Sequence, residues 1–196
     1  MRRASSVCRL RPLVLVHGGP TQINTSFGIV MEIRRIRAHE GPRLRALRLT
    51  ALADAPTAFG STLAEAQVHP QEYWARRAQE AAVAETSAMF VAEENERWYG
   101  IAGSFFHRDY PHTVRLVSMW VDPTRRRSGV GSALVEAVIQ WARGREATCL
   151  QLWVTDTNHE AKSLYTRHGF VETEHLKPLP SNPILREVLM VRHLIA

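Results

Sequence analysis

The chain has 196 residues and a mass of 22.2 kDa, which suits one domain with a sizeable core. Its hydrophobic content of 45% and charged content of 22% are typical of a globular protein, and no apolar run is long enough to span a bilayer. The net charge is +6, but residues 1–30 contain four arginines and no acidic residue. The remainder has 21 basic and 19 acidic residues, a small excess that does not favour nucleic acid as a partner.

Residues 1–30 form a segment of their own. Their only short apolar stretch, residues 13–16, follows two arginines and is too short for the core of a signal peptide. We expect a disordered extension or a start assigned too far upstream, with a packed extra strand as the alternative. The domain itself is expected to cover residues 31–196. Cys8 and Cys149 are the only cysteines and have no metal-ligand or disulfide spacing, so we expect a reducing cytoplasm and no metal.

Hydrophobic periodicity predicts a regular order of strands and helices. A strand at 31–37 precedes two helices, one over residues 42–55 and one starting near Pro70. Three strands, a helix after Gly129, a strand and a helix ending at Gly169 follow, and the chain finishes with two strands separated by a proline-rich loop. The strands are expected at residues 88–94, 98–108, 112–121, 148–155, 170–176 and 186–194, and the loop at 177–183. This order indicates a mixed α/β sheet in one domain.

The stretch TRRRSGVGSAL, residues 124–134, joins arginines to a Gly-x-Gly and then to an apolar helical pattern. Glycines allow close approach to a ligand, and a helix N-terminus favours an anion, so the stretch fits a pyrophosphate site. The alternative is a flexible loop with solvated arginines. A Walker A loop would need a lysine that is absent, and a dinucleotide-binding loop would have a small residue where Leu134 stands.

The pattern Arg126-x-x-Gly129-x-Gly131, preceded by VDP and followed by NHEAKSLYTRHGF, resembles the GNAT superfamily of acyl-CoA-dependent N-acetyltransferases. The resemblance runs from Met31 to the C-terminus in element order and is detailed from Leu116 to Phe170. It implies a mostly antiparallel sheet flanked by helices, with splayed central strands. The residues of the second motif that fall at the family's spacing are Asn158, Ala161, Leu164, Tyr165, Gly169 and Phe170.

The resemblance also implies the site. Coenzyme A would lie against the following residues: Met119, Trp120, Val121, Arg126, Arg127, Ser128, Gly129, Val130, Gly131, Ser132 and Asn158. A backbone N–H of Met119 or Val121 would polarise the thioester carbonyl. Tyr165 would be the general acid that protonates the departing thiolate, unless it is only a core aromatic residue. Phe59 and Trp74 could line the acceptor site, or equally belong to the core.

The implied reaction is direct attack of an amine on acetyl-CoA, the co-substrate, without an acyl-enzyme. Several family members carry a glutamate base where this chain has Arg115, so the base stays open among His107, Asp109, His112 and a water relay. The acceptor would be a small-molecule or peptide amine, and the oligomeric state stays open, a homodimer included. The alternatives are a non-catalytic acyl-CoA-binding module and a basic nucleic-acid-binding protein.

Overall fold

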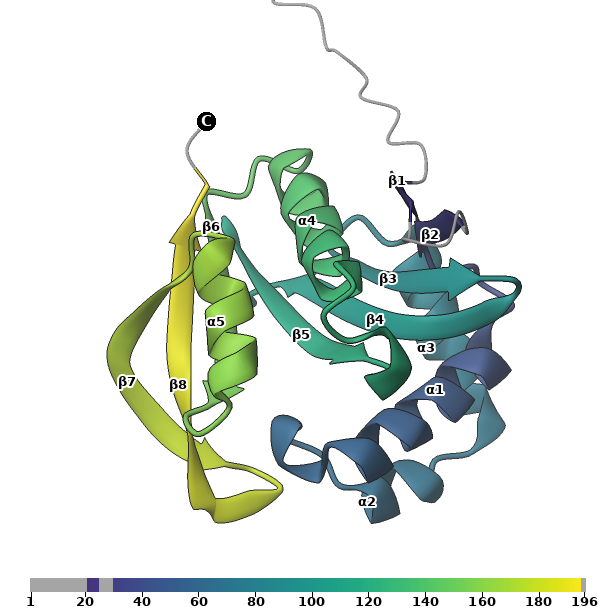
Figure 1. Ribbon diagram of the computed structural model, residues 1–196, viewed down its shortest axis with the longest axis horizontal. Coiled ribbons are helices and arrows are strands. Elements are labelled where there is room, and N and C mark those ends of the chain that lie inside the picture. Colours follow the sequence, from purple (N-terminus) through teal and green to yellow (C-terminus); the bar gives the residue numbers. More distant parts are fainter. Residues whose placement is uncertain (1–20, 25–29, 195–196) are drawn as a thin grey trace, which may run out of the picture.

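The computed structural model describes residues 21–24 and 30–194. Within them, one sheet has the strand order β1-β2-β3-β4-β5-β6-β8-β7 (Figure 1). All neighbouring strands are antiparallel except β5 and β6, which are parallel. The strands are β1 (Thr21–Asn24), β2 (Val30–Arg35), β3 (Ser87–Glu94), β4 (Arg97–Phe106), β5 (Thr113–Val121), β6 (Cys149–Thr155), β7 (Val171–Leu179) and β8 (Asn182–His193). The predicted single-domain, mostly antiparallel sheet is confirmed.

Helices cover both faces of this sheet. The α-helices are α1 (Gly41–Asp54), α2 (Leu63–Gln67), α3 (Gln71–Val83), α4 (Val130–Arg143) and α5 (His159–Arg167), and the short 3-10 helices are η1 (Pro56–Ala58) and η2 (Pro123–Arg125). Side chains alternate along β3: Ala88 and Ala92 join the core under α4, whereas Met89 and Val91 join the core under α1 and α3. None of the described helices has the length and apolar character needed to cross a membrane.

Part of the N-terminal segment adds a strand to the sheet. Thr21–Asn24 pairs antiparallel with β2, with Thr21 opposite Ile33. The packed extra strand, which we gave as the alternative, is therefore present at these four residues. The expectation of a disordered extension otherwise concerns residues 1–20 and 25–29, which lie outside the described residues.

Two further elements differ from the sequence prediction. Helix α2 was not predicted, although Thr62 and Glu65 form a capping box that marks its start. The predicted proline-rich loop, residues 177–183, is longer than the observed one, because β7 continues to Leu179 and β8 begins at Asn182. Pro178 is compatible with this pairing because β7 is the edge strand of the sheet and need not donate a hydrogen bond outward.

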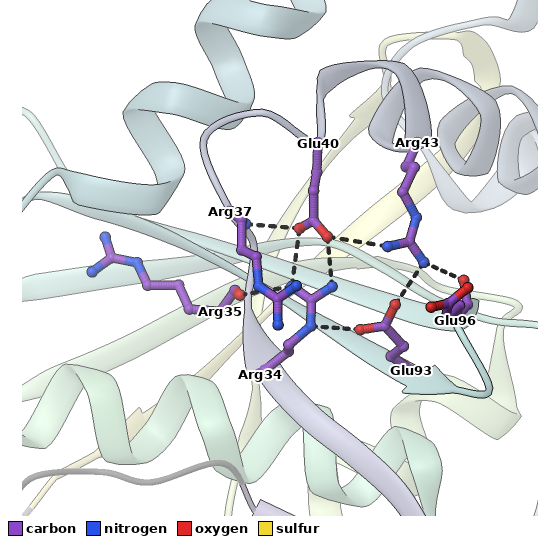
Figure 2. A network of polar contacts seen from close by, with 7 residues as sticks. All are labelled: Arg34, Arg35, Arg37, Glu40, Arg43, Glu93 and Glu96. Carbon is purple, nitrogen blue, oxygen red and sulfur yellow. Dashed lines mark hydrogen bonds and ion pairs between the residues drawn. The ribbon is translucent and has the colours of Figure 1, made fainter.

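A buried ion-pair network fixes the start of α1 against β2 and β3 (Figure 2). The Arg34 guanidinium donates to both Glu40 carboxylate oxygens at 2.6 and 2.9 Å and to Glu93 at 2.6 Å. Arg43 donates to the other Glu93 oxygen at 2.7 Å, and the Arg37 backbone N–H donates to Glu40 at 2.8 Å. Glu40 is 2% exposed, so these hydrogen bonds are what allows its charge to lie in the interior.

Candidate active site

Strands β5 and β6 begin side by side and then diverge (Figure 1). They pair only at Thr113–Cys149, Val114–Leu150 and Arg115–Gln151. From Leu116 to Val121, the β6-facing edge of β5 has no strand partner among the described residues. The predicted splay of the central strands is thus confirmed, and it leaves backbone groups available to an extended ligand.

A β-bulge shapes this open edge. The β4–β5 register shifts between Ile101 and Gly103, and Ser118 on β5 has a φ of 55°. After the bulge, the Asp122 N–H donates to the Tyr99 carbonyl of β4 at 2.8 Å. Because successive residues of a regular strand present their amides to opposite sides, the Val121 N–H faces the open edge, whereas Met119 lies within the bulge, where this alternation is interrupted.

Trp120 was grouped with Met119 and Val121 in the sequence analysis, but its side chain turns to the opposite face of the sheet. It is 4% exposed and belongs to the core under α1 and α3. Its indole Nε1 donates to Asp54 Oδ2 at 2.8 Å, at the end of α1. Trp120 therefore anchors β5 to α1 and presents no side chain to the gap.

The N-terminus of α4 lies beside the open edge, and no side chain of the described residues caps it. Its N-cap residue, Gly129, has a φ of 90°, and an added Cβ would meet no atom within 4 Å. At Gly131 an added Cβ would lie 3.3 Å from Leu164 Cδ2 and 3.5 Å from Met119 Cε. The first turn of α4, the open edge of β5 and helix α5 thus meet at one point. Free helix N–H groups in this position suit an anion.

The arginines before α4 each have an acidic partner in this structure. Arg126 pairs with Asp54, and its Nε donates to the Val121 carbonyl at 3.1 Å. Arg127, which has a φ of 61°, pairs with Glu160 on α5 at 2.8 Å. An incoming anion would have to compete with the carboxylates of Asp54 and Glu160 for these arginines. Both ion pairs are exposed, and water screening makes such pairs contribute little to stability.

Three other residues predicted to contact coenzyme A have side chains that already make contacts within the protein. The Ser128 hydroxyl donates to the Arg125 carbonyl at 2.6 Å, and Val130 is 1% exposed in the core. Ser132 Oγ lies 2.6 Å from His168 Nε2. At Ser128 and Val130, therefore, it is the backbone amides that could contact a ligand.

Helix α5 brings Tyr165 and Asn158 to the same region. Tyr165 is 6% exposed and packs edge-to-face on Phe170, and burial raises the pKa of its phenol. Its hydroxyl makes no hydrogen bond with any described residue. Asn158 caps α5, because its Oδ1 accepts from the Ala161 N–H at 3.1 Å.

On the other face of the sheet, a cavity of about 440 Å³ lies between the helices α1, α2 and α3 and the strands β3, β4 and β5. We call it the α1–α3 pocket; Arg48, Trp74 and Ser118 are among its lining residues. Trp74 lines the pocket and also belongs to the core under α1 and α3, so both interpretations given for it stay open. Phe59 does not line the pocket but packs under Arg48, whose guanidinium carbon lies 4.2 Å from the ring centroid.

The base candidates from the sequence are placed at the wrong end of the sheet. His107, Asp109 and His112 belong to the β4–β5 connection, where β5 is still paired with β6. At the usual rise per residue, the start of β5 is about 20 Å from Met119. The titratable side chains that line the α1–α3 pocket are instead Glu65, His69, Tyr73 and Arg77, together with Arg48. His69 lies in the loop before α3, and its ring stacks on that of Tyr73 with the centroids 3.9 Å apart.

The sequence is similar to a known protein family and to individual members of it. Residues 51–170, more than half of the chain, match the model of the acetyltransferase (GNAT) family. An aminoglycoside N(6′)-acetyltransferase type 1 of Klebsiella aerogenes is 38% identical over 69 residues, which cover 35% of this chain and 45% of that protein. An uncharacterised N-acetyltransferase of Bacillus subtilis is 34% identical over 95 residues, 44% of this chain and 60% of that protein. The matches thus span less than two thirds of these relatives.

Two solved structures show the same fold. An acetyltransferase of the GNAT family from Streptococcus pneumoniae has a TM-score of 0.70 at 22% identity, over 84% of this chain and 99% of that one. The structure of yncA from Salmonella typhimurium with its cofactor acetyl-CoA has a TM-score of 0.71 at 19% identity, over 85% and 95% of the two chains. With the family model covering the loop before α4 and all of α5, the chain belongs to the acetyltransferase (GNAT) family.

Proposed function

We propose that this protein transfers an acetyl group from acetyl-CoA to a primary amine. The observation that carries the proposal is the meeting of the unpaired β5 edge, the uncapped N-terminus of α4 and the Tyr165 helix at the point where β5 and β6 diverge. Membership of the GNAT family supports the same activity.

The described residues fit a coenzyme A molecule. The backbone amides from Arg127 to Ser132 would bind its pyrophosphate, because Gly129 leaves open space and no side chain caps the helix. The open amide of Val121 would pair with the extended pantetheine arm as a further strand does, with Met119 beside it in the bulge. Asn158 would contact this arm through its side-chain amide nitrogen, since its Oδ1 already caps α5.

The chemistry would use one backbone and one side-chain donor. The amine attacks the thioester carbonyl, and the N–H of Met119 or Val121 stabilises the negative charge that develops on its oxygen. When the C–S bond breaks, Tyr165 donates its phenolic proton to the leaving sulfur. Burial keeps this phenol protonated at neutral pH, as a general acid requires. No acyl-enzyme is needed.

The acceptor would enter through the α1–α3 pocket, which reaches Ser118 on the β5 bulge, one residue from Met119. Its volume of about 440 Å³ is within the range of small-molecule sites. His69 lines this pocket and is our candidate for removing the proton from the attacking amine, directly or through a water.

The test is to mix the protein with acetyl-CoA and a panel of amines and to follow release of free thiol, with calorimetry for acetyl-CoA binding. The panel includes amino acids, peptides and, because of the Klebsiella aerogenes relative, aminoglycosides. We expect acetyl-CoA binding and amine-dependent thiol release. Binding without thiol release would favour the non-catalytic acyl-CoA-binding module, and absence of binding would reject the proposal.

A further inference from the structure

Arg48 on α1 is a partly buried cation with an incomplete set of partners. Its Nη2 donates to Ser61 Oγ at 2.9 Å, and its guanidinium lies over the Phe59 ring. Its Nη1 is buried and has no hydrogen-bond partner among the described residues. Burial, with help from nearby Arg77, lowers the pKa of Arg48 to about 10, so the side chain still carries its charge at neutral pH. A buried charged donor without a partner is costly and calls for an explanation.

A second unpaired donor lines the same pocket. Trp74 on α3 is 3% exposed, and its indole Nε1 has no partner among the described residues. Trp98 and Trp141 also have an Nε1 without a partner in the described part of the chain, but neither lines the pocket. Arg48 and Trp74 therefore line one cavity, and each has an unused hydrogen-bond donor, that of Arg48 being positively charged.

The other charges of the pocket do not neutralise Arg48. Arg77 adds a second positive charge and donates to the Tyr73 hydroxyl at 2.8 Å. Glu65 is exposed, and its carboxylate accepts from the Thr62 N–H at 2.8 Å in the capping box of α2. Most of the remaining lining is apolar, for example Leu44, Ala66, Met89 and Ile101.

We propose that the acceptor carries an oxoanion, a carboxylate or phosphonate, which binds Arg48 Nη1 and Trp74 Nε1 while its amine points toward Ser118 on the β5 bulge. This inference rests on the proposed acetyltransferase activity. A guanidinium binds planar oxoanions through directed N–H groups, and one such ligand would satisfy both unpaired donors. The apolar lining suits an acceptor with an apolar body, so the substrate class is that of apolar amino acids and their phosphonate analogues.

The experiment compares four acceptors with one apolar skeleton: the amino acid, its aminophosphonate, its carboxamide and the amine that lacks the acid group. An aminoglycoside is the polycationic comparison. In the wild type we expect kcat/KM for the two acids to exceed that for the carboxamide. A hydrogen bond to a charged group is worth about 1.5–3 kcal/mol, so Arg48→Gln should reduce this preference roughly ten- to hundredfold. The carboxamide itself should lose little. Trp74→Phe, which keeps an aromatic ring but removes the N–H, should reduce the preference less.

Arg45→Gln on the same helix is the matched control, since Arg45 does not line the pocket, and its acid preference should equal that of the wild type. Calorimetry with acetyl-CoA shows that each variant is folded and binds the co-substrate. If the wild type acetylates amines without preferring the acids, or if the preference survives in both Arg48→Gln and Trp74→Phe, the oxoanion site is wrong while the acetyltransferase activity stands. If the wild type does not bind acetyl-CoA, the underlying function fails. A difference between carboxylate and phosphonate identifies which oxoanion fits.

Discussion

Ser132 in the first turn of α4 and His168 at the end of α5 are joined by a 2.6 Å contact between Oγ and Nε2. This contact ties together the two helices that flank the proposed coenzyme A site. Burial is the main cause that lowers the pKa of His168 below its usual value of 6.5, and Arg192 and Arg167 act in the same direction against Glu136. The imidazole is therefore neutral in the folded protein at neutral pH.

The lowered pKa of His168 predicts a loss of stability in mild acid. The unfolded chain binds this proton more tightly than the folded one, so the contribution is present above pH 6.5 and is lost as pH falls through the lowered pKa. We expect Tm to fall between pH 7.5 and pH 5 by less in His168→Gln than in the wild type. His175→Gln, on exposed strand β7, is the control and should follow the wild type. Equal acid sensitivity of all three proteins would contradict the prediction.

Tyr165→Phe should reduce kcat by about a hundredfold or more without weakening acetyl-CoA binding, because general acid catalysis typically contributes this much. Since the hydroxyl has no hydrogen bond among the described residues, its removal should leave Tm nearly unchanged. Steady-state kinetics, calorimetry and thermal melts measure the three quantities. Tyr99→Phe on β4 serves as the control, and unaltered turnover in Tyr165→Phe would reject the general-acid role.

Gly131→Val should weaken acetyl-CoA binding at least about tenfold. Its branched side chain would compete with Leu164 and Met119, which already lie at 3.3 and 3.5 Å from an added Cβ, and would narrow the space beside the first turn of α4. Gly144→Val at the other end of the same helix is the control, because an added Cβ there meets only ordinary contacts. Calorimetry gives the dissociation constant of acetyl-CoA for both variants. If both substitutions weaken acetyl-CoA binding equally, the ligand does not lie beside the first turn of α4.

Glu40→Gln should destabilise the fold by roughly 3–5 kcal/mol, because it leaves the buried charge of Arg34 without its bidentate partner. Denaturant titration measures the change in the free energy of unfolding. Glu80→Gln breaks the exposed Arg76–Glu80 pair and should cost at most about 1 kcal/mol. A change as small as that of Glu80→Gln would show that the network in Figure 2 contributes little to stability.

Sequence patterns predicted correctly those features that depend on residues close together in the chain. Gly129 and Gly169 were predicted to bound helices, and both have a positive φ that glycine adopts without strain. The apolar stripe of α4 predicted its buried face, because the helical period alone brings those residues together. The helix that was predicted to end at Gly169 is present as α5 and carries Tyr165.

The direction of Trp120 required the tertiary structure. Both faces of β5 are covered by helices, so apolar residues occur on both and the sequence does not say which face carries the gap. The same holds for the bases proposed near His107, because strand pairing decides that β5 separates from β6 only after Arg115.

The sequence by itself thus determined the order of the elements apart from β1 and α2, the glycine loop before α4 and the helix that carries Tyr165, since each depends on neighbours a few residues apart. Only the tertiary structure decided that Arg48 and Trp74 face one cavity with Ser118 at its wall. These residues lie on three elements far apart in the chain, and packing of α1 and α3 against the sheet is what brings their side chains together.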